Sequence, residues 1–242
     1  MKVIDIIEDK IDKMPLNYIF TYCDFVIENR CTSSIIKSLN NLAKEGKIQK
    51  FAKGKYYKSR TTKYGDTKPS AYEIVKDFIE KDGKLIGYLT GHAIYSDLGL
   101  TTQISNKIQI GTSKYRRSLK RDKYIVSFVI QPNHITKDNY ELLQILDSMR
   151  FFKRIPASRS DEVCERLKWL VAQLSPQKMI TMTNLSLKYT DSVRALLGAI
   201  LENMTVEPQL FDKLKKSLNK ITEYKLGISE KTLPSIKNWR IR

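Results

Sequence analysis

The start of the chain carries apolar residues at the spacing of an amphipathic helix: Val3, Ile4, Ile7 and Ile11. This spacing predicts a helix that ends at Met14-Pro15, because the residue before a proline avoids the α conformation. Residues 18–27 are largely apolar and predict a short strand or turn that leads into a second helix. Residues 29–32 then predict a turn.

The next apolar pattern, in residues 32–46, predicts a third helix. Thr32 or Ser33 is a suitable N-cap, and Gly46 supplies a C-terminal stop. Apolar positions three and four apart define the expected buried stripe of this helix: Ile35, Ile36, Leu39, Leu42 and Ala43.

A tight β-hairpin is expected at residues 47–58. Lys53, Gly54 and Lys55 form its predicted tip, where Gly54 provides the turn geometry. Tyr56 and Tyr57 fall on opposite faces of the second strand, so we expect one of them to pack inward and the other to face outward.

Beyond the hairpin, residues 61–69 have the composition of a linker, and helices and strands then alternate. We expect helices at residues 71–81 and 90–98, and strands at residues 85–88, 107–112 and 124–130. From Thr136 onward the pattern is helical, with the short connections of an antiparallel bundle. These helices are predicted at residues 139–151, 161–174, 176–188, 192–203 and 208–221.

The charge distribution adds a functional interpretation to the third helix and the hairpin. The chain of 242 residues has a formal net charge of +17, which favours polyanionic partners, although surface lysines also serve solubility alone. The positive charge is densest in residues 32–65, where nine lysines and arginines accompany one acid, Glu45. A polar helix face followed by a basic hairpin is typical of a winged helix-turn-helix, which binds double-stranded DNA.

The predicted DNA-binding residues lie on the polar face of this helix and on the hairpin. Lysine side chains reach phosphates, whereas serine and asparagine can hydrogen-bond to base edges in the major groove. The same pattern also fits an ordinary solvated helix surface, and the basic hairpin beside it favours DNA binding. The set is Ser34, Lys37, Ser38, Asn41, Lys44, Lys53, Gly54, Lys55 and Lys58.

A second basic patch lies between the last two predicted strands. Residues 114–123 contain six basic side chains and one acid. Three interpretations stay open: contact with the DNA backbone, binding of an acidic partner, or a solvated hairpin. The candidate binding residues are Lys114, Arg116, Arg117, Lys120 and Arg121.

The sequence contains none of the common catalytic motifs, such as a P-loop, GxGxxG, HExxH or GxSxG. His92 and His134 stand apart from each other and from cysteine, so no metal site is expected. Asp161, Glu162 and Glu165 cluster in the first turns of a predicted helix, where acids favour the helix dipole. We therefore expect no enzyme activity and no cofactor, with a metal-dependent nuclease as the weakest alternative.

Cysteine usage and hydropathy bear on location. The three cysteines, Cys23, Cys31 and Cys164, have no CxxC spacing, and the N-terminal residues do not resemble a signal peptide. No run of eighteen apolar residues occurs, so no membrane partner is expected. These features predict a soluble cytoplasmic protein.

Together the patterns predict an α+β fold in three parts. Residues 1–65 would form a winged helix-turn-helix DNA-binding domain, and residues 66–135 a small mixed α/β domain. Residues 136–242 would form a C-terminal helical bundle.

Three sequence elements, taken in order, also resemble a known family. They are the unit ending Leu42-Ala-Lys-Glu-Gly-Lys-Ile-Gln-Lys-Phe-Ala-Lys-Gly-Lys-Tyr-Tyr57, the pair Tyr64-Gly65, and Leu98-Gly-Leu-Thr-Thr-Gln103 with Thr112 ending the next strand. They are similar to the AbiEi-type antitoxins of bacterial type IV toxin–antitoxin systems. The resemblance covers residues 1–131.

The resemblance implies a transcriptional repressor and antitoxin of the kind that acts in abortive infection, a form of phage defence. Such proteins bind inverted-repeat operators upstream of their own operon and counter a nucleotidyltransferase-like toxin, which they need not contact directly. The helical region after Thr136 would then serve toxin antagonism or oligomerisation. Two alternatives stay open: a protein-interaction module with an incidental basic surface, and a plain transcriptional regulator without a toxin partner.

Overall fold

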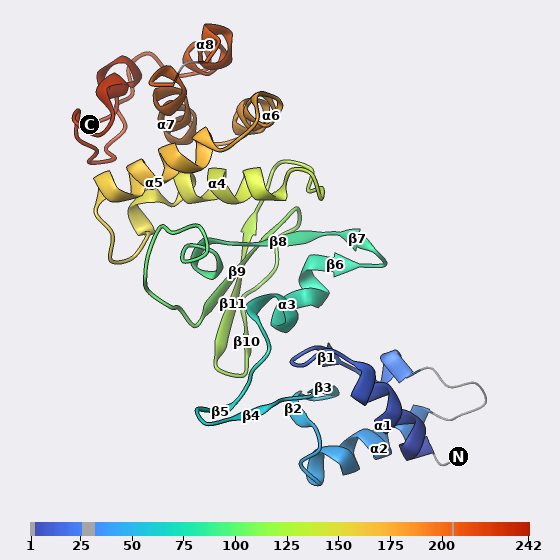
Figure 1. Cartoon of the computed structure of the whole chain (residues 1–242). Coiled ribbons are helices and arrows are strands. Elements are labelled where there is room, and N and C mark those ends of the chain that lie inside the picture. Colours follow the sequence, from blue (N-terminus) through green and yellow to red (C-terminus); the bar gives the residue numbers. More distant parts are fainter. Residues whose placement is uncertain (1–2, 26–31, 205) are drawn as a thin grey trace. The chain divides into compact units, whose positions relative to one another are not determined.

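A computed structural model describes residues 3–25, 32–204 and 206–242 of the chain (Figure 1). Most of the turn expected at residues 29–32, including Cys31, lies outside the described residues. The chain mixes helices with several small sheets, as expected, and divides into two compact units. The first unit comprises Met1–Lys76 and Lys120–Tyr124, and the second comprises Asp77–Leu119 and Ile125–Arg242.

In the first unit two helices pack together beside a three-stranded antiparallel sheet of order β1-β3-β2. Apolar side chains of both helices and of the sheet form one core. The helix and hairpin expected at residues 32–58 are confirmed. The elements are α1 (Val3–Lys13), β1 (Ile19–Phe20), the 3-10 helix η1 (Tyr22–Phe25), α2 (Thr32–Lys44), β2 (Gln49–Ala52) and β3 (Lys55–Tyr57).

The buried stripe of α2 is narrower than expected. Ile35, Leu39 and Leu42 are buried, whereas Ile36 is 39% exposed, so its predicted burial is wrong. Successive residues of a helix differ by about 100° around the axis. Ile36 therefore points away from the side on which Ile35 and Leu39 join the core.

Both tyrosines of β3 are buried, which corrects the expectation that one of them faces outward. Tyr56 stacks on Phe20 in the core, with ring centroids 6.4 Å apart. Tyr57 points to the opposite face of the sheet. There it lines a cavity of about 180 Å³ together with Ile74 and Tyr124 of the same unit. The chain therefore covers both faces of β3.

Residues 61–69, expected to be a linker, contain a second hairpin instead. Strands β4 (Thr61–Thr62) and β5 (Gly65–Asp66) pair antiparallel, with Lys63 and Tyr64 at the turn. Figure 1 shows them as a narrow ribbon that extends beyond the three-stranded sheet. Helix α3 (Ala71–Ile79) follows, ending before residue 81 because the next residues enter a strand.

Apart from the tip of the β10–β11 hairpin, a four-stranded sheet of order β10-β11-β9-β8 belongs to the second unit. Strands β9 and β11 run parallel, and β8 pairs antiparallel with β9. The strands expected at residues 107–112 and 124–130 are confirmed at those bounds. The strands are β6 (Glu80–Lys81) and β7 (Lys84–Leu85), which form a separate ribbon, then β8 (Gly87–Thr90), β9 (Lys107–Thr112), β10 (Leu119–Arg121) and β11 (Tyr124–Ile130).

The helix expected at residues 90–98 is wrong; the segment forms a 3-10 turn, η2 (Gly91–Ala93), followed by further turns. Gly91 has a φ of +57°, outside the right-handed helical region. The Gln109 side chain lies against it and accepts a hydrogen bond from the backbone N–H of His92 at 3.1 Å. The left-handed φ of +69° at Gly99 agrees with the expected stop of this segment.

The helices expected after residue 136 are confirmed within a few residues of their predicted bounds, except that α8 ends earlier, at Lys216. Residues 224–242 form a C-terminal segment that the apolar pattern did not predict. The elements are α4 (Tyr140–Arg150), η3 (Phe152–Arg154), α5 (Ser160–Ala172), α6 (Pro176–Ser186), α7 (Asp191–Glu202), α8 (Pro208–Lys216) and η4 (Pro234–Trp239). In the described part of the chain, no helix has the length and apolar character needed to cross a membrane.

A buried polar cluster lies within the apolar core of the second unit. The carboxylate of Asp147 accepts hydrogen bonds from three hydroxyl groups, those of Tyr88 (2.6 Å), Thr90 (2.8 Å) and Tyr189 (3.0 Å). Burial raises the pKa of Asp147, and the three donors oppose that shift. Gln131 donates to the hydroxyls of Tyr88 and Tyr189, both at 2.7 Å.

Candidate nucleic-acid interface

The outward face of α2 carries the predicted groove-contacting side chains. Residues three and four apart on a helix are neighbours on its surface, so these side chains form one stripe. Four of them are exposed and Ser38 is half-buried. None of their side chains makes a hydrogen bond or ion pair with another described residue. The stripe comprises Ser34, Lys37, Ser38, Asn41 and Lys44.

Asn40, which the sequence did not single out, fixes α2 against the hairpin. Its Nδ2 donates to the carbonyl oxygen of Ile36 at 3.0 Å, and its Oδ1 accepts from the hydroxyl of Tyr56 at 2.8 Å. Because Tyr56 belongs to β3, its hydrogen bond links the helix to the hairpin, whereas the bond to Ile36 stays within α2. The polar stripe therefore lies on a helix that is held in place by its apolar core contacts and by the hydrogen bond between Asn40 and Tyr56.

The tip of the β2–β3 hairpin lies where the sequence predicted it. Ala52 pairs with Lys55, so Lys53 and Gly54 form the turn, and Gly54 has a φ of +72°. A Cβ at Gly54 would meet no atom within 4 Å, so the turn needs glycine for its backbone conformation rather than for space. Lys53 is exposed and Lys55 is half-buried.

Two lysines beside the hairpin bind to α1, and one of them, Lys47, stays exposed. Lys58, a predicted DNA contact, donates from Nζ to the carbonyl oxygen of Asp12 at 2.8 Å and is half-buried. The structure therefore does not bring Lys58 together with the other candidates. Lys47 pairs with Glu8 at 2.5 Å, and this hydrogen bond raises the pKa of Lys47.

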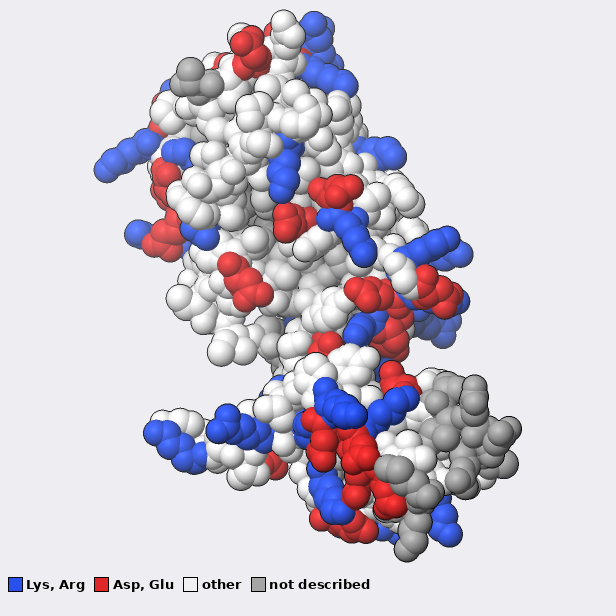
Figure 2. All heavy atoms as spheres, turned by 45° about the vertical axis from the view of Figure 1, so that its right-hand side comes forward, with Lys and Arg blue, Asp and Glu red and all other residues white. Residues whose placement is uncertain are grey.

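Charge is segregated within the first unit. Helix α1 contains four of the acids of residues 1–31, whereas residues 32–65 hold nine basic side chains and one acid. Figure 2 shows acidic side chains gathered on the body of this unit and a projecting arm on which basic side chains predominate. A polyanion would be attracted to the basic segment and repelled by α1.

The five residues of the second basic patch are shared between the two units. Lys114, Arg116 and Arg117 are exposed in the loop after β9 and belong to the second unit. Lys120 is exposed and Arg121 is half-buried, and both belong to the first unit. The patch therefore divides between two bodies.

Two arginines of this patch have contacts within their own unit. The guanidinium of Arg116 lies 5.3 Å from the ring centroid of Phe78 and 6.0 Å from that of Phe128. Arg121 donates from Nη1 to the carbonyl oxygen of Ile74 at 2.6 Å. Arg121 thus has a structural contact, while the guanidinium of Arg116 is within cation–π distance of two aromatic rings.

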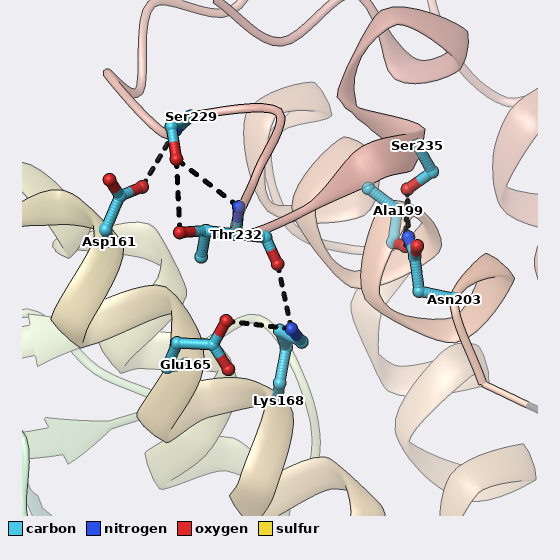
Figure 3. Close-up of polar contacts among 8 residues, drawn as sticks. All are labelled: Asp161, Glu165, Lys168, Ala199, Asn203, Ser229, Thr232 and Ser235. Atoms are coloured by element: carbon cyan, nitrogen blue, oxygen red, sulfur yellow. Dashed lines mark hydrogen bonds and ion pairs between the residues drawn. The ribbon is translucent and has the colours of Figure 1, made fainter.

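The acids at the start of α5 hold the C-terminal segment (Figure 3). Asp161 accepts from the backbone N–H of Ser229 at 2.8 Å, and this hydrogen bond lowers the pKa of Asp161. Lys168 pairs with Glu165 at 3.0 Å and donates to the carbonyl oxygen of Thr232 at 2.8 Å. Among the described residues, no group of three or more His, Cys, Asp or Glu side chains is arranged to hold a metal ion.

The Leu98–Gln103 element is anchored to the helical part of the second unit. Residues 102–104 remain exposed, with Ile104 97% exposed. The anchors are hydrogen bonds from Arg166 to the carbonyl of Leu98 (2.6 Å), from Ser158 to that of Leu100 (2.7 Å) and from Thr101 to that of Pro156 (2.7 Å).

Comparison with known proteins identifies a family and a solved structure of similar fold. Residues 6–173 match a family described as a family of unknown function, DUF6088. The structure is similar to the crystal structure of the RV2827C protein from Mycobacterium tuberculosis, with a TM-score of 0.58 and 14% sequence identity over 91% of this chain and 83% of that chain. Identity this low shows a shared fold alone. No match was found among curated protein sequences.

Proposed function

This chain belongs to the DUF6088 family, and we propose that it is a double-stranded DNA-binding protein. In this proposal the first unit is a winged helix-turn-helix. Helix α2 enters the major groove, and the β2–β3 hairpin is the wing that contacts the backbone beside it.

The unpaired polar stripe of α2 carries this proposal. Lys37, Asn41 and Lys44 have no partner among the described residues, whereas Lys47 and Lys58 of the same basic segment bind to α1. A helix surface that serves only solubility would not need its unpartnered lysines to be kept apart from those that bind to α1. Phosphates would attract the lysines, and the amide of Asn41 can donate to and accept from an adenine edge.

We further propose that the protein is a repressor and antitoxin of a type IV toxin–antitoxin system. This part rests on the resemblance carried by Leu98–Gln103 and by the helix-to-hairpin unit. The protein would repress its own operon at an inverted repeat and counter a nucleotidyltransferase-like toxin, with or without direct contact. A plain transcriptional regulator would share the DNA-binding part alone.

Footprinting on the DNA upstream of the protein's own coding sequence tests the DNA-binding part. We expect a protected inverted repeat and an affinity that falls steeply as salt rises, because bound lysines release counterions. The proposal would be refuted if no sequence were protected and if the affinity of the protein for DNA did not change with salt. Co-expression with the adjacent gene tests the antitoxin part: rescue of growth from a toxic nucleotidyltransferase-like product is expected.

A further inference from the structure

The β4–β5 hairpin is a part of the first unit that the proposed function does not use. Residues 61–66 are all exposed, and Tyr64 at the turn is 88% exposed. A single exposed aromatic ring is common on protein surfaces. The hydrogen bonds that hold the hairpin below Tyr64 distinguish this segment from a linker.

Side-chain hydrogen bonds rather than packing hold the turn of this hairpin. The hydroxyl of Thr62 accepts from the backbone N–H of Tyr64 at 3.2 Å and donates to the carbonyl oxygen of Gly65 at 2.7 Å. Gly65 has a φ of +101°, which favours glycine. These bonds define the position of the tip without any apolar core.

The base of the hairpin is fastened to the body of the first unit through Thr67. Its hydroxyl accepts from the backbone N–H of Arg60 at 3.0 Å and donates to Oδ1 of Asn17 at 2.9 Å. Asn17 has a φ of +64°, and its own N–H donates to the carbonyl oxygen of Lys58 at 2.8 Å. The ribbon therefore starts from a fixed platform, as a presented binding element would.

The chemistry of the hairpin matches a ligand with both negative charge and flat surfaces. Residues 60–68 contain three basic side chains and one acid, Asp66, and that carboxylate accepts from the hydroxyl of Thr61 at 2.7 Å. Nζ of Lys63 lies 4.9 Å from the ring centroid of Tyr64. Nucleic acid supplies phosphates for such cations and sugar and base surfaces for the ring.

On the premise that the first unit binds DNA as proposed above, we propose that β4–β5 is a second DNA contact, an arm that lies in the minor groove flanking the groove entered by α2. Lys63 would neutralise phosphate at the rim of the groove, and the ring of Tyr64 would lie against the sugars and base edges inside it. Minor-groove arms of DNA-binding domains and inserted side chains act in this way.

Binding to duplexes of two lengths tests the arm. The shorter duplex, about one helical turn, holds the α2 site alone, and the longer duplex, about three turns, also offers the flanking minor groove. We expect Tyr64→Ala to weaken binding to the longer duplex about fivefold or more, because the ring no longer buries its surface in the groove, with little effect on the shorter one. Lys63→Ala should lower the salt dependence on the longer duplex by about one phosphate contact.

Three variants make the comparison specific. Tyr64→Phe keeps the ring and should bind like the wild type, and Lys13→Ala removes an exposed charge from α1, a helix that carries none of the proposed contacts. Because residues 63 and 64 are exposed, their variants should have unchanged unfolding temperatures. A changed unfolding temperature in Tyr64→Ala alone, with unchanged affinity, would give Tyr64 a structural role and overturn the inference.

The failure of the arm and the failure of the proposed function give different results. If Lys53→Ala weakens binding while Lys63→Ala and Tyr64→Ala bind like the wild type, DNA binding stands and the arm is overturned. If the wild type binds neither duplex, both are overturned. Tighter, Tyr64-dependent binding of a single strand of the same length would also overturn the minor-groove assignment, because the ring would then be stacking on unpaired bases.

Discussion

Asn40 and Asn41 are adjacent in the sequence but have different surroundings: Asn40 is half-buried and Asn41 is exposed. Asn40 bridges α2 and β3 through its hydrogen bond with Tyr56, whereas the side chain of Asn41 has no partner among the described residues. The apolar periodicity was sufficient to identify the outward stripe of α2. It gave no sign that Asn40 holds the helix, because that role depends on a tyrosine hydroxyl sixteen residues away.

The stripe and the hairpin tip should affect DNA binding in different ways. Replacing Lys37 and Asn41 together by alanine should erode the preference for the operator, since a good base contact contributes about 1–3 kcal/mol of discrimination. Lys53→Ala should weaken operator and unrelated DNA alike, because phosphate contacts carry no sequence information. Titrations of both DNAs, with Lys13→Ala as control, measure the difference. Unchanged specificity in the double variant would contradict a major-groove role for α2.

Tyr189→Phe removes one of the three hydroxyls that bind the carboxylate of Asp147. Burial already raises the pKa of Asp147, and loss of a donor should raise it further. When the pKa of a carboxyl is higher in the folded than in the unfolded protein, the protonated form favours the fold. This contribution is fully present at a pH below the unfolded pKa, and it is lost as pH rises through the folded pKa. The variant should thus lose about 1–3 kcal/mol at neutral pH and less near pH 4. Urea unfolding across this range checks it; a pH-independent loss would contradict it.

At the scale of elements, long periodic segments were predictable and short polar ones were not. Strands β9 and β11 are rich in β-branched and aromatic residues, and their bounds agree with the expectation. The β4–β5 hairpin has no apolar alternation, and its base depends on a hydrogen bond between Thr67 and Asn17, fifty residues apart. Local patterns cannot report such a contact. The same holds for η2, where Gln109 occupies the space beside Gly91.

Thr67→Val should loosen the β4–β5 hairpin without unfolding the first unit. Valine has nearly the shape of threonine but cannot accept from Arg60 or donate to Asn17. Hydrogen exchange of the amides in residues 61–66 should become faster, while the amides of α2 keep their protection. Thr67→Ser retains the hydroxyl and serves as the matched control. Equal exchange in the valine and serine variants would show that the hydroxyl does not fix the ribbon.

At the scale of the whole molecule, the C-terminal segment completes the core of the second unit. Trp239 is fully buried, and its indole N–H donates to Glu202 at 2.6 Å. Ser235 donates to the carbonyl oxygen of Ala199 at 2.8 Å and bonds to Asn203 (Figure 3). Local periodicity could not predict this segment, because its residues are held by contacts with α5 and α7, far away in the chain.

Gly198→Ala should displace the ring of Trp239. A Cβ at Gly198 would lie 2.1 Å from the nearest ring atom, closer than any real contact. Overpacking of this kind costs about 1–3 kcal/mol. Thermal or urea unfolding measures the loss, and Trp239→Phe provides the test of mechanism. If the clash is with the indole, Gly198→Ala should cost less in the phenylalanine background; equal costs in both backgrounds would place the strain elsewhere.

The cluster around Asp147 has a consequence for the synthesis of the protein. Its members come from β8, the residues after β11, α4 and the turn before α7, with sequence separations of 42 to 59 residues between bonded pairs. At about 5–20 residues per second, the ribosome would deliver Tyr189 on the order of ten seconds after Tyr88. Until then Asp147 lacks the hydrogen bond from Tyr189, and the cluster around it is incomplete. The second unit would therefore reach its native state late in translation, with its sheet waiting for the helices rather than folding ahead of them.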